Sequence, residues 1–404
     1  MPCPAAPTAP PAPPAPCAAP PRRRPRTVQA AQAALAAWAT ACLATALAAP
    51  PVLLPIRQGE QHGLIAADGR VLLPAEYDEV LPGDPLIGVR RGPRTAYVDH
   101  AGRTVVAPQE AWTQPFHDGL IAAPATQGEA RGRWGHADAQ GRWVTPPQWD
   151  EALPFVDGLA LVARADDWGR RRWGAIDRSG RLVVPATHEK LLATGGGLLR
   201  SEDRARRHRV LDAEGRDITP DGVDFAGQAR EGRLRVWSGP LQGFMDATGR
   251  LVVPPRYAQA GDFHGGRARV WVDGRVGFID RDGRVAVAPR WEAAEDFADG
   301  LALVREGGRS RFIDAEGRVV LEPQGVDRVG SFADGLAPAR VGRLHGYIDR
   351  SGRIAIAPRF SVARPFQHGL AWVLEDGRAA YIDREGRAVW RAAPRPGPQA
   401  TSTP

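Results

Sequence analysis

The sequence predicts an all-β protein, a tandem array of about ten units, each with about three short antiparallel strands. Three observations lead to this prediction. A Gly-Arg pair recurs ten times, at intervals of about 34 residues. In nine of the ten copies an Asp stands three positions before the Gly. Further Pro, aromatic and Phe positions keep the same register after each Gly. A period of this length indicates a repeat architecture.

The Asp-x-x-Gly spacing predicts the turn between two strands of each unit. Asp at the first position of a type I turn accepts hydrogen bonds from nearby backbone N–H groups, and Gly at the fourth position takes the left-handed conformation. The predicted turn residues are Asp99, Gly102, Asp138, Gly141, Asp177, Gly180, Asp246, Gly249, Asp280, Gly283, Asp314, Gly317, Asp349, Gly352, Asp383 and Gly386. Asp212 and Gly215 follow the same spacing in the fifth unit, and Ala66 replaces the Asp in the first.

Period-2 alternation supports strands on both sides of the turn. Ile354 and Ile356 alternate with alanines, and one unit supplies strands over about 301–304, 311–314 and 318–321. A linker then follows, with a recurrent aromatic and a recurrent Phe such as Phe297. We interpret these aromatics as core anchors between units. A single unit has too little apolar surface to fold alone, so stacking must complete the core.

The sequence leaves two ways to arrange the units. About 34 residues suit three strands, fewer than the four strands of a typical propeller blade. Ten such blades in one ring would leave a wide hole, so we predict an open, twisted, solenoid-like array. Propeller-like closure is the alternative.

The two ends of the chain differ in composition from the array at about 60–390. Residues 1–21 are mostly Pro and Ala and are predicted to be disordered, as is the tail at 391–404. Residues 22–49 combine an arginine-rich start, an apolar centre and a small-residue exit, which predicts a signal peptide. We therefore expect a periplasmic or secreted protein without a transmembrane span in the mature chain. The alternatives are a lipid anchor at Cys42, or a cytoplasmic protein if this segment is not a signal.

The charge of the chain argues against a nucleic-acid partner. The formal net charge is +7, but Arg22, Arg23, Arg24 and Arg26 lie in a segment without acidic residues. The rest of the chain therefore has a net charge of only +3, and its arginines alternate with acids. We expect a protein or a cell-envelope polymer as partner.

No motif of catalysis, metal binding or cofactor binding is found. The zinc-protease helix, the Gly-x-Ser-x-Gly elbow, the phosphate-binding loop and the dinucleotide fingerprint are all missing. We therefore predict no catalytic residues, no metal and no cofactor. An alternative is a glycan hydrolase that uses carboxylates from neighbouring units. Nine equivalent acids fit a structural turn better than one special pair.

Two units are about five residues longer than the others, and both insertions precede the strand that ends in Asp. They lie at about Pro124–Arg133 and Arg164–Arg172. Insertions in repeat proteins often gather on the binding face, although a neutral loop elongation is the alternative. The candidate partner-binding residues are Glu129, Arg131, Arg133, Asp166, Asp167, Trp168, Arg170, Arg171 and Arg172.

The chain resembles bacterial WG-repeat proteins over about residues 60–390. Trp134-Gly135 and Trp173-Gly174 open two units, and Ile176-Asp177, Gly180-Arg181 and Pro185 follow the second of them. Other units keep the Gly but lose the Trp, as in Gln242-Gly243, Val276-Gly277 and His345-Gly346. The fifth unit has His208-Arg209 instead. The resemblance implies a β-rich repeat module and supplies no catalytic residues. We therefore expect a non-catalytic, exported repeat protein that binds or scaffolds its partner over an extended surface.

Overall fold

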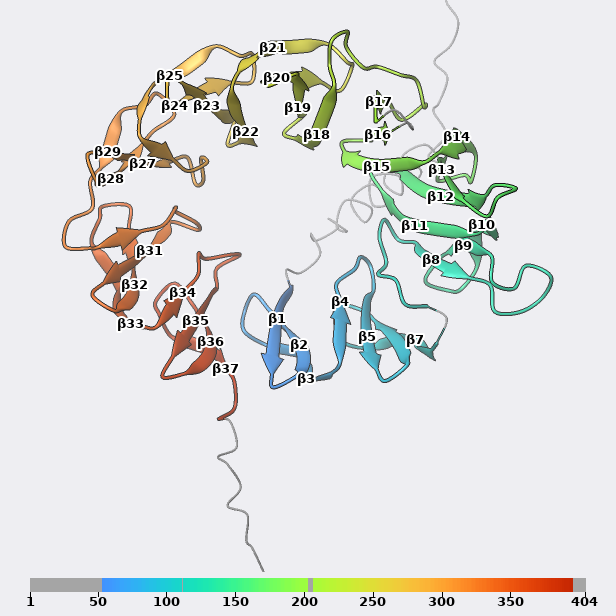
Figure 1. The fold of residues 1–404 in the computed structure, drawn as a ribbon. Helices are drawn as coiled ribbons and strands as arrows, with labels where there is room; N and C mark the ends of the chain where they lie inside the picture. Colours follow the sequence, from blue (N-terminus) through green and yellow to red (C-terminus); the bar gives the residue numbers. More distant parts are fainter. Residues whose placement is uncertain (1–52, 111, 203–205, 395–404) are drawn as a thin grey trace, which may run out of the picture. The chain divides into compact units, whose positions relative to one another are not determined.

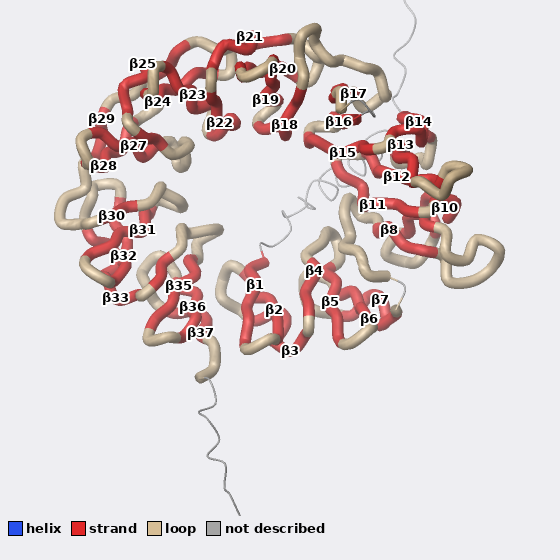
Figure 2. The backbone as a smooth tube through the Cα atoms, in the orientation of Figure 1, coloured by secondary structure: helices blue, strands red, loops and turns tan. Residues whose placement is uncertain are grey.

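The computed structural model describes residues 53–110, 112–202 and 206–394. These residues form strands, turns and loops and no helix, as Figure 2 shows. The predicted disordered segment at 1–21, the signal peptide at 22–49 with Cys42, and most of the tail at 391–404 lie outside the described residues. No helix in the described part of the chain is long and apolar enough to cross a membrane.

Ten small antiparallel sheets follow one another around a ring (Figure 1). We call them blades 1 to 10. The strands of the first five blades are β1(Leu53–Gln58), β2(Gln61–Ala66) and β3(Val71–Tyr77); β4(Glu79–Leu81), β5(Ile87–Arg91), β6(Arg94–Val98) and β7(Thr104–Gln109); β8(Ile121–Pro124), β9(Trp134–Ala137) and β10(Trp143–Trp149); β11(Glu151–Val156), β12(Leu159–Ala165), β13(Arg171–Asp177) and β14(Leu182–His188); and β15(Lys190–Gly195), β16(Leu198–Glu202) and β17(His208–Leu211).

The last five blades have four strands each. They are β18(Phe225–Arg230), β19(Arg233–Ser238), β20(Leu241–Asp246) and β21(Leu251–Tyr257); β22(Gln259–His264), β23(Arg267–Val272), β24(Arg275–Asp280) and β25(Val285–Trp291); β26(Ala293–Ala294), β27(Ala302–Glu306), β28(Arg309–Ile313) and β29(Val319–Leu321); β30(Arg328–Val329), β31(Leu336–Val341), β32(Leu344–Asp349) and β33(Ile354–Phe360); and β34(Val362–Ala363), β35(Ala371–Glu375), β36(Arg378–Ile382) and β37(Ala388–Arg391).

The prediction of an open array is wrong, and the alternative of propeller-like closure is confirmed. Blade 1 meets blade 10, where Leu54 and Ile56 share one core cluster with Leu370 and Tyr381. The Tyr381 hydroxyl donates a hydrogen bond of 2.9 Å to the carbonyl of Pro55 across this junction. The chain is therefore a closed ten-bladed propeller.

The prediction of three strands per unit missed a fourth strand. In most blades the segment that follows the recurrent Pro forms the first strand of the next blade, as in β22, which ends with Phe263 and His264. This first strand lies nearest the middle of the ring, and the second, third and fourth strands follow outward (Figure 1). The sequence did not predict this first strand, because proline precedes it and its pairing with the second strand contains a bulge.

The core lies between blades rather than within them. Trp291 and Phe278 of blade 7 share a cluster with Phe297 and Ile313 of blade 8. The recurrent Phe packs edge-on against the third strand of the preceding blade, and the Phe278 and Phe297 ring centroids are 4.8 Å apart. Each blade thus needs its neighbours to bury its apolar faces, which explains why closure stabilises the ring.

The turn glycine has a second role at most blade junctions. Gly283 has a φ of 81°, and a Cβ there would also lie 2.6 Å from a methyl carbon of Val253 in the preceding blade. A Cβ added to Gly69 of blade 1 would likewise lie 2.5 Å from the Cβ of Val389 in blade 10. The junction that closes the ring therefore repeats this contact of an ordinary junction.

Another glycine controls the fourth strand. Gly277 lies in the third strand, and a Cβ there would be 2.5 Å from the Val287 carbonyl oxygen. The six blades with Gly at this position, which are blades 1, 3, 4, 6, 7 and 9, all have a fourth strand of 7 residues. Blades 2 and 10 have Ala96 and Ala380 at this position, and their fourth strands have 6 and 4 residues. Blade 8 has Arg311 at this position and a fourth strand of 3 residues, and blade 5, with Arg209, has no fourth strand among its described residues.

Candidate functional site

The two elongated loops lie in neighbouring blades, 3 and 4, at the same end of the third strands. The first comprises residues 125–133 between β8 and β9, and the second comprises residues 166–170 between β12 and β13. Asp150 joins them: its carboxylate pairs with the Arg133 guanidinium and accepts a 2.7 Å hydrogen bond from the Ala165 N–H. The structure therefore places the two predicted loops side by side. We call them the paired-loop surface.

The loop boundaries differ from the prediction in blade 4. Arg164 belongs to β12, and Arg171 and Arg172 belong to β13. Arg171 pairs with Glu151 at 2.9 Å, whereas Arg172 pairs with Asp166 at 3.0 Å and with Glu189 at 3.1 Å. Arg171 and Arg172 hold the base of the loop, and residues 166–170 form its tip.

That tip is an additional copy of the repeat turn, which the sequence reasoning missed. Asp166-Asp167-Trp168-Gly169-Arg170 has the Asp-x-x-Gly-Arg spacing. Its Asp166 accepts hydrogen bonds from the N–H groups of Trp168 (3.0 Å) and Arg170 (2.9 Å). Burial opposes ionisation, but these bonds and the Arg170 and Arg172 guanidinium groups lower the pKa of Asp166 to about 2. The loop is therefore rigidly braced.

Trp168 stands at the tip of this braced turn with 81% of its surface exposed. The nine turns at the other end of the blades have small or polar residues at the equivalent position: Ala101, Gln140, Ser179, Glu214, Thr248, Asp282, Glu316, Ser351 and Glu385. A large aromatic at this position is specific to the blade 4 loop. Ordering an exposed aromatic in advance lowers the entropic cost of binding a partner.

The first loop adds exposed polar groups beside Trp168's turn. Ala125 and Gly132 are held by backbone hydrogen bonds of 2.8 Å that close the base of the loop. Glu129 and Arg131 are exposed, and neither side chain forms an ion pair with another described residue. Asp167 is exposed in the same way. The surface thus offers charges of both signs to a partner.

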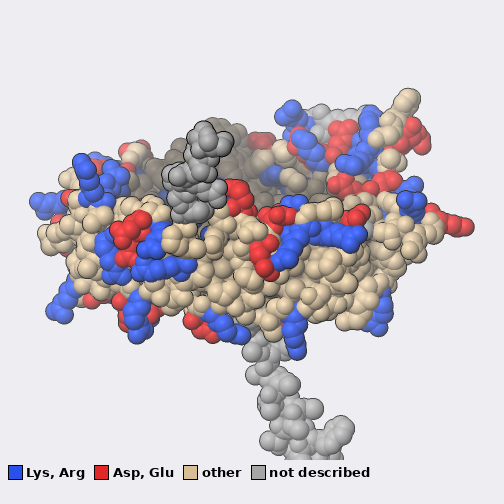
Figure 3. Space-filling model, turned by 90° about the horizontal axis from the view of Figure 1, so that it is seen from below, with Lys and Arg blue, Asp and Glu red and all other residues tan. Residues whose placement is uncertain are grey.

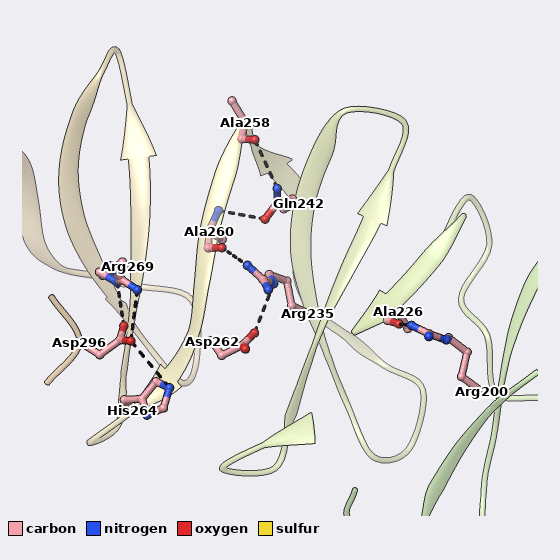
Figure 4. A network of polar contacts seen from close by, with 10 residues as sticks. All are labelled: Arg200, Ala226, Arg235, Gln242, Ala258, Ala260, Asp262, His264, Arg269 and Asp296. Atoms are coloured by element: carbon pink, nitrogen blue, oxygen red, sulfur yellow. Dashed lines mark hydrogen bonds and ion pairs between the residues drawn. The ribbon is translucent and has the colours of Figure 1, made fainter. Parts of the chain in front are cut away.

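A second polar network lies between the blades near the middle of the ring, and the sequence reasoning missed it as well. Arg200, Arg235 and Arg269 occupy the second strands of blades 5, 6 and 7 (Figure 4). Each guanidinium donates to a carbonyl in the first strand of the next blade, for example Arg269 to Ala294 at 2.9 Å. In the sequence, Arg235 and Arg269 each stand two positions after a Gly-Arg pair, at 232–233 and 266–267. This pattern could have revealed these two of the three arginines.

The acids of this network are already neutralised. Asp262 pairs with Arg235 at 3.2 Å, and Asp296 pairs with Arg269 at 2.7 Å. His264 lies 3.8 Å from the Asp296 carboxylate (Figure 4). We interpret this network as a brace between blades, because each group has an intramolecular partner.

The recurrent turn acids also have hydrogen-bond partners within the chain. Each of the nine accepts hydrogen bonds from the backbone N–H groups two and four residues on; for Asp99 both are 2.9 Å. The Arg103 backbone and guanidinium lower the pKa of Asp99. Similar contacts, against the opposing effect of burial, lower the pKa of Asp138, Asp177, Asp212, Asp246, Asp314, Asp349 and Asp383. The structure thus places these acids in turns.

On the side of the ring that Figure 3 shows, charged side chains of both signs lie around a broad uncharged area. Figure 3 shows Lys and Arg interspersed with Asp and Glu along the rim, without an area of one sign. In the described part of the chain no group of three or more His, Cys, Asp or Glu residues is placed to hold a metal ion.

Comparisons with known proteins point to one family. Segments 134–166, 243–275, 277–309, 311–344 and 346–378 match the family model described as "WG containing repeat". A search of curated proteins found no match.

Similar solved structures include Kluyveromyces lactis Hsv2, with 9% identity, a TM-score of 0.29 and coverage of 57% of this chain and 87% of that chain. The extracellular domain of the hybrid two component system BT3049 from B. thetaiotaomicron has 9% identity, a TM-score of 0.24 and coverage of 85% and 65%. The WD40 beta propeller domain of Doa1 has 12% identity, a TM-score of 0.25 and coverage of 65% and 88%. These low values support no statement about function.

Proposed function

Since the chain belongs to the family of proteins with the WG containing repeat, we propose that it is a non-catalytic ring scaffold that binds a partner protein at the paired-loop surface. The observation that supports this most is Trp168, 81% exposed on a turn held by four hydrogen bonds to Asp166. Trp and Arg are the residues that most often dominate protein interfaces. They favour a protein over an envelope polymer as the partner.

A non-catalytic role is supported by the state of the acids. A general acid in glycoside hydrolysis needs a raised pKa, whereas hydrogen bonds lower the pKa of Asp166 and of the turn acids. Asp262 and Asp296 are each paired with an arginine. The alternative of a glycan hydrolase therefore has no specific pair of carboxylates in its favour among the described residues.

We also propose that the protein works outside the cytoplasm, periplasmic or secreted. This part rests on the signal-like composition of residues 22–49. Cell fractionation with amino-terminal sequencing tests it. Full-length protein in the cytosol, with residues 1–48 retained, would contradict export.

Affinity capture with single variants tests the binding site. The Trp168→Ser variant should lose, by about tenfold or more, the partners that the natural protein captures from an envelope extract of its own cells. Trp143→Ser is the matched control, because Trp143 is also exposed (40%) but lies in β10 away from the loop tips. Equal capture by all three proteins would remove the paired-loop surface as the binding site.

A further inference from the structure

Blade 1 has no first strand among the described residues. Ile56 of β1 pairs with Gly63, just as Val270 of β23 pairs with Gly277. By this register β1 is the second strand of its blade, and β2 and β3 are the third and fourth. No described strand pairs with the inner edge of β1. A sheet edge without a strand partner is the requirement for strand addition.

The aromatic anchor that six other junctions have is missing here too. At those junctions the recurrent Phe, in or just after the first-strand segment, packs on an aromatic or His ring in the preceding blade, as Phe366 packs on Tyr347 at 4.9 Å. Tyr381 is the equivalent third-strand aromatic of blade 10. Its described ring neighbour is Trp390, at 6.2 Å, from its own blade. At this junction Tyr381 therefore lacks the Phe ring from the next blade that packs at the equivalent position of the six other junctions.

A groove of about 1410 Å³ lies at this position between blades 1 and 10. Its apolar wall includes Leu54, Ile56, Leu370, Trp372, Tyr381 and Trp390. Arg364 and Arg378 stand exposed at its rim, and neither forms an ion pair with a described residue. The groove thus combines an apolar wall with two arginines that have no described ion pair, of which Arg364 lies over the Trp372 ring, 5.0 Å from its centroid.

Hydrogen bonding at the groove shows where an added strand would pair. The Tyr347 hydroxyl donates to Arg364 O (2.7 Å) in the first strand region of the next blade. The Tyr381 hydroxyl instead donates to Pro55 O, on a second strand. Pro338 is the counterpart of Pro55 in blade 9, and its carbonyl accepts a 2.9 Å bond from Gly330 N–H of the adjoining first-strand segment. The carbonyl of Pro55 is therefore the acceptor that a first strand would use.

The chain immediately before β1 is unsuited to supply this strand by the usual turn. In blade 7 the first and second strands are joined through Gly265 and Gly266, with φ values of 57° and 75°. The sequence has Pro51 and Val52 at the equivalent positions, which lie outside the described residues. A proline ring holds φ near −65°, so this sequence does not favour a turn with two positive φ values. An occupant from another molecule fits better.

We propose that the groove between blades 1 and 10 binds an extended segment of a partner protein, which adds to the inner edge of β1 as the first strand of blade 1. Its aromatic side chain packs against Tyr381, and one of its N–H groups donates to the Pro55 carbonyl, which has a second lone pair beside the one that accepts from the Tyr381 hydroxyl. Acidic residues beside the aromatic pair with Arg364 and Arg378. This proposal is independent of the paired-loop surface, which lies in blades 3 and 4.

A peptide copied from the chain itself provides a probe. The hexapeptide of residues 259–264, Gln-Ala-Gly-Asp-Phe-His, forms a first strand in blade 7 and contains both the aromatic and an acid. We expect the fluorescein-labelled peptide to bind the full-length protein, measured by fluorescence anisotropy. Replacing its Phe by Ala should weaken binding about tenfold or more, because the aromatic supplies the buried contact.

Protein variants locate the binding. Arg364→Glu should weaken binding of the peptide severalfold, by about three- to tenfold, whereas the exposed Arg343→Glu in blade 9 should leave binding unchanged. A version of the peptide with benzoylphenylalanine at the Phe should crosslink to β1 or to the neighbourhood of Tyr381.

Three results would overturn the proposal. The first is no binding of either peptide, and the second is crosslinking to other blades. The third is binding only to a protein that lacks residues 1–52, which would show that the chain's own amino-terminal segment fills the groove.

Discussion

Blades 5 and 7 differ most clearly at one position of the third strand. In blade 7 Gly277 lets the Val287 carbonyl approach, and a fourth strand of 7 residues forms. In blade 5 Arg209 occupies the same position, pairs with Asp217 at 3.7 Å and leaves a single bridge between Leu211 and Asp217. The comparison teaches that the glycine of the repeat controls the fourth strand through close backbone approach, not through a positive φ.

The largest effect should come from making blade 7 resemble blade 5. Gly277→Arg places a Cβ 2.5 Å from the Val287 carbonyl oxygen and should displace β25. We expect a loss of about 3–5 kcal/mol in unfolding free energy, with loss of hydrogen-exchange protection over 285–291. Gly227→Ala is the control for a general effect of replacing glycine, because Gly227 has no positive φ and an added Cβ would meet its nearest neighbour at 3.4 Å. Unchanged protection at 285–291 would show that the side chain is accommodated.

Acid should weaken blade 5 through its turn acid. The pKa of Asp212 is lowered, and that of Asp177, the turn acid of blade 4, falls to about 2. The folded state therefore binds fewer protons than the unfolded state between the two pKa values. This stabilisation is complete above about pH 4 and is lost as the pH falls towards 2. Thermal melts from pH 5 to pH 2 should show the decline, and a flat melting temperature would contradict it.

The reverse change in blade 5 should have a smaller effect. Arg209→Gly removes the obstructing side chain and allows residues 217–219 to pair more closely with β17. Pro220 limits the gain to these few residues, since proline lacks the N–H for further pairing. We expect the Thr219 amide to exchange about tenfold more slowly, measured by hydrogen exchange. Exchange at the natural rate would mean that another feature of blade 5 prevents the strand.

The smallest effect is expected outside both blades, in the loop tip of blade 4. Trp168 is 81% exposed, so Trp168→Ser should change the unfolding free energy by less than about 0.5 kcal/mol. Chemical denaturation measures this change. A larger loss would mean that Trp168 packs against the fold and is no preorganised contact for a partner.

The candidate site was only partly accessible from the sequence. The two insertions could be found because they interrupt a regular period, and their adjacency follows from adjacent units. The bridge by Asp150 could not be found, because Arg133 and Ala165 meet only when blades 3 and 4 stack. The additional turn at Asp166 was recognisable from its spacing, but only the structure shows that Trp168 points into solvent.

The sequence by itself determined the all-β class, the ten units and the turn residues such as Asp280 and Gly283. These features depend on local hydrogen bonds and on backbone conformations that a few neighbouring residues set. Closure was decided by contacts between ends of the chain more than 300 residues apart, as between Tyr381 and Pro55. No local pattern in the sequence records how successive blades are oriented, because this depends on packing between blades, such as the contact of Gly69 with Val389. Only the tertiary structure could therefore separate a ring from an open array.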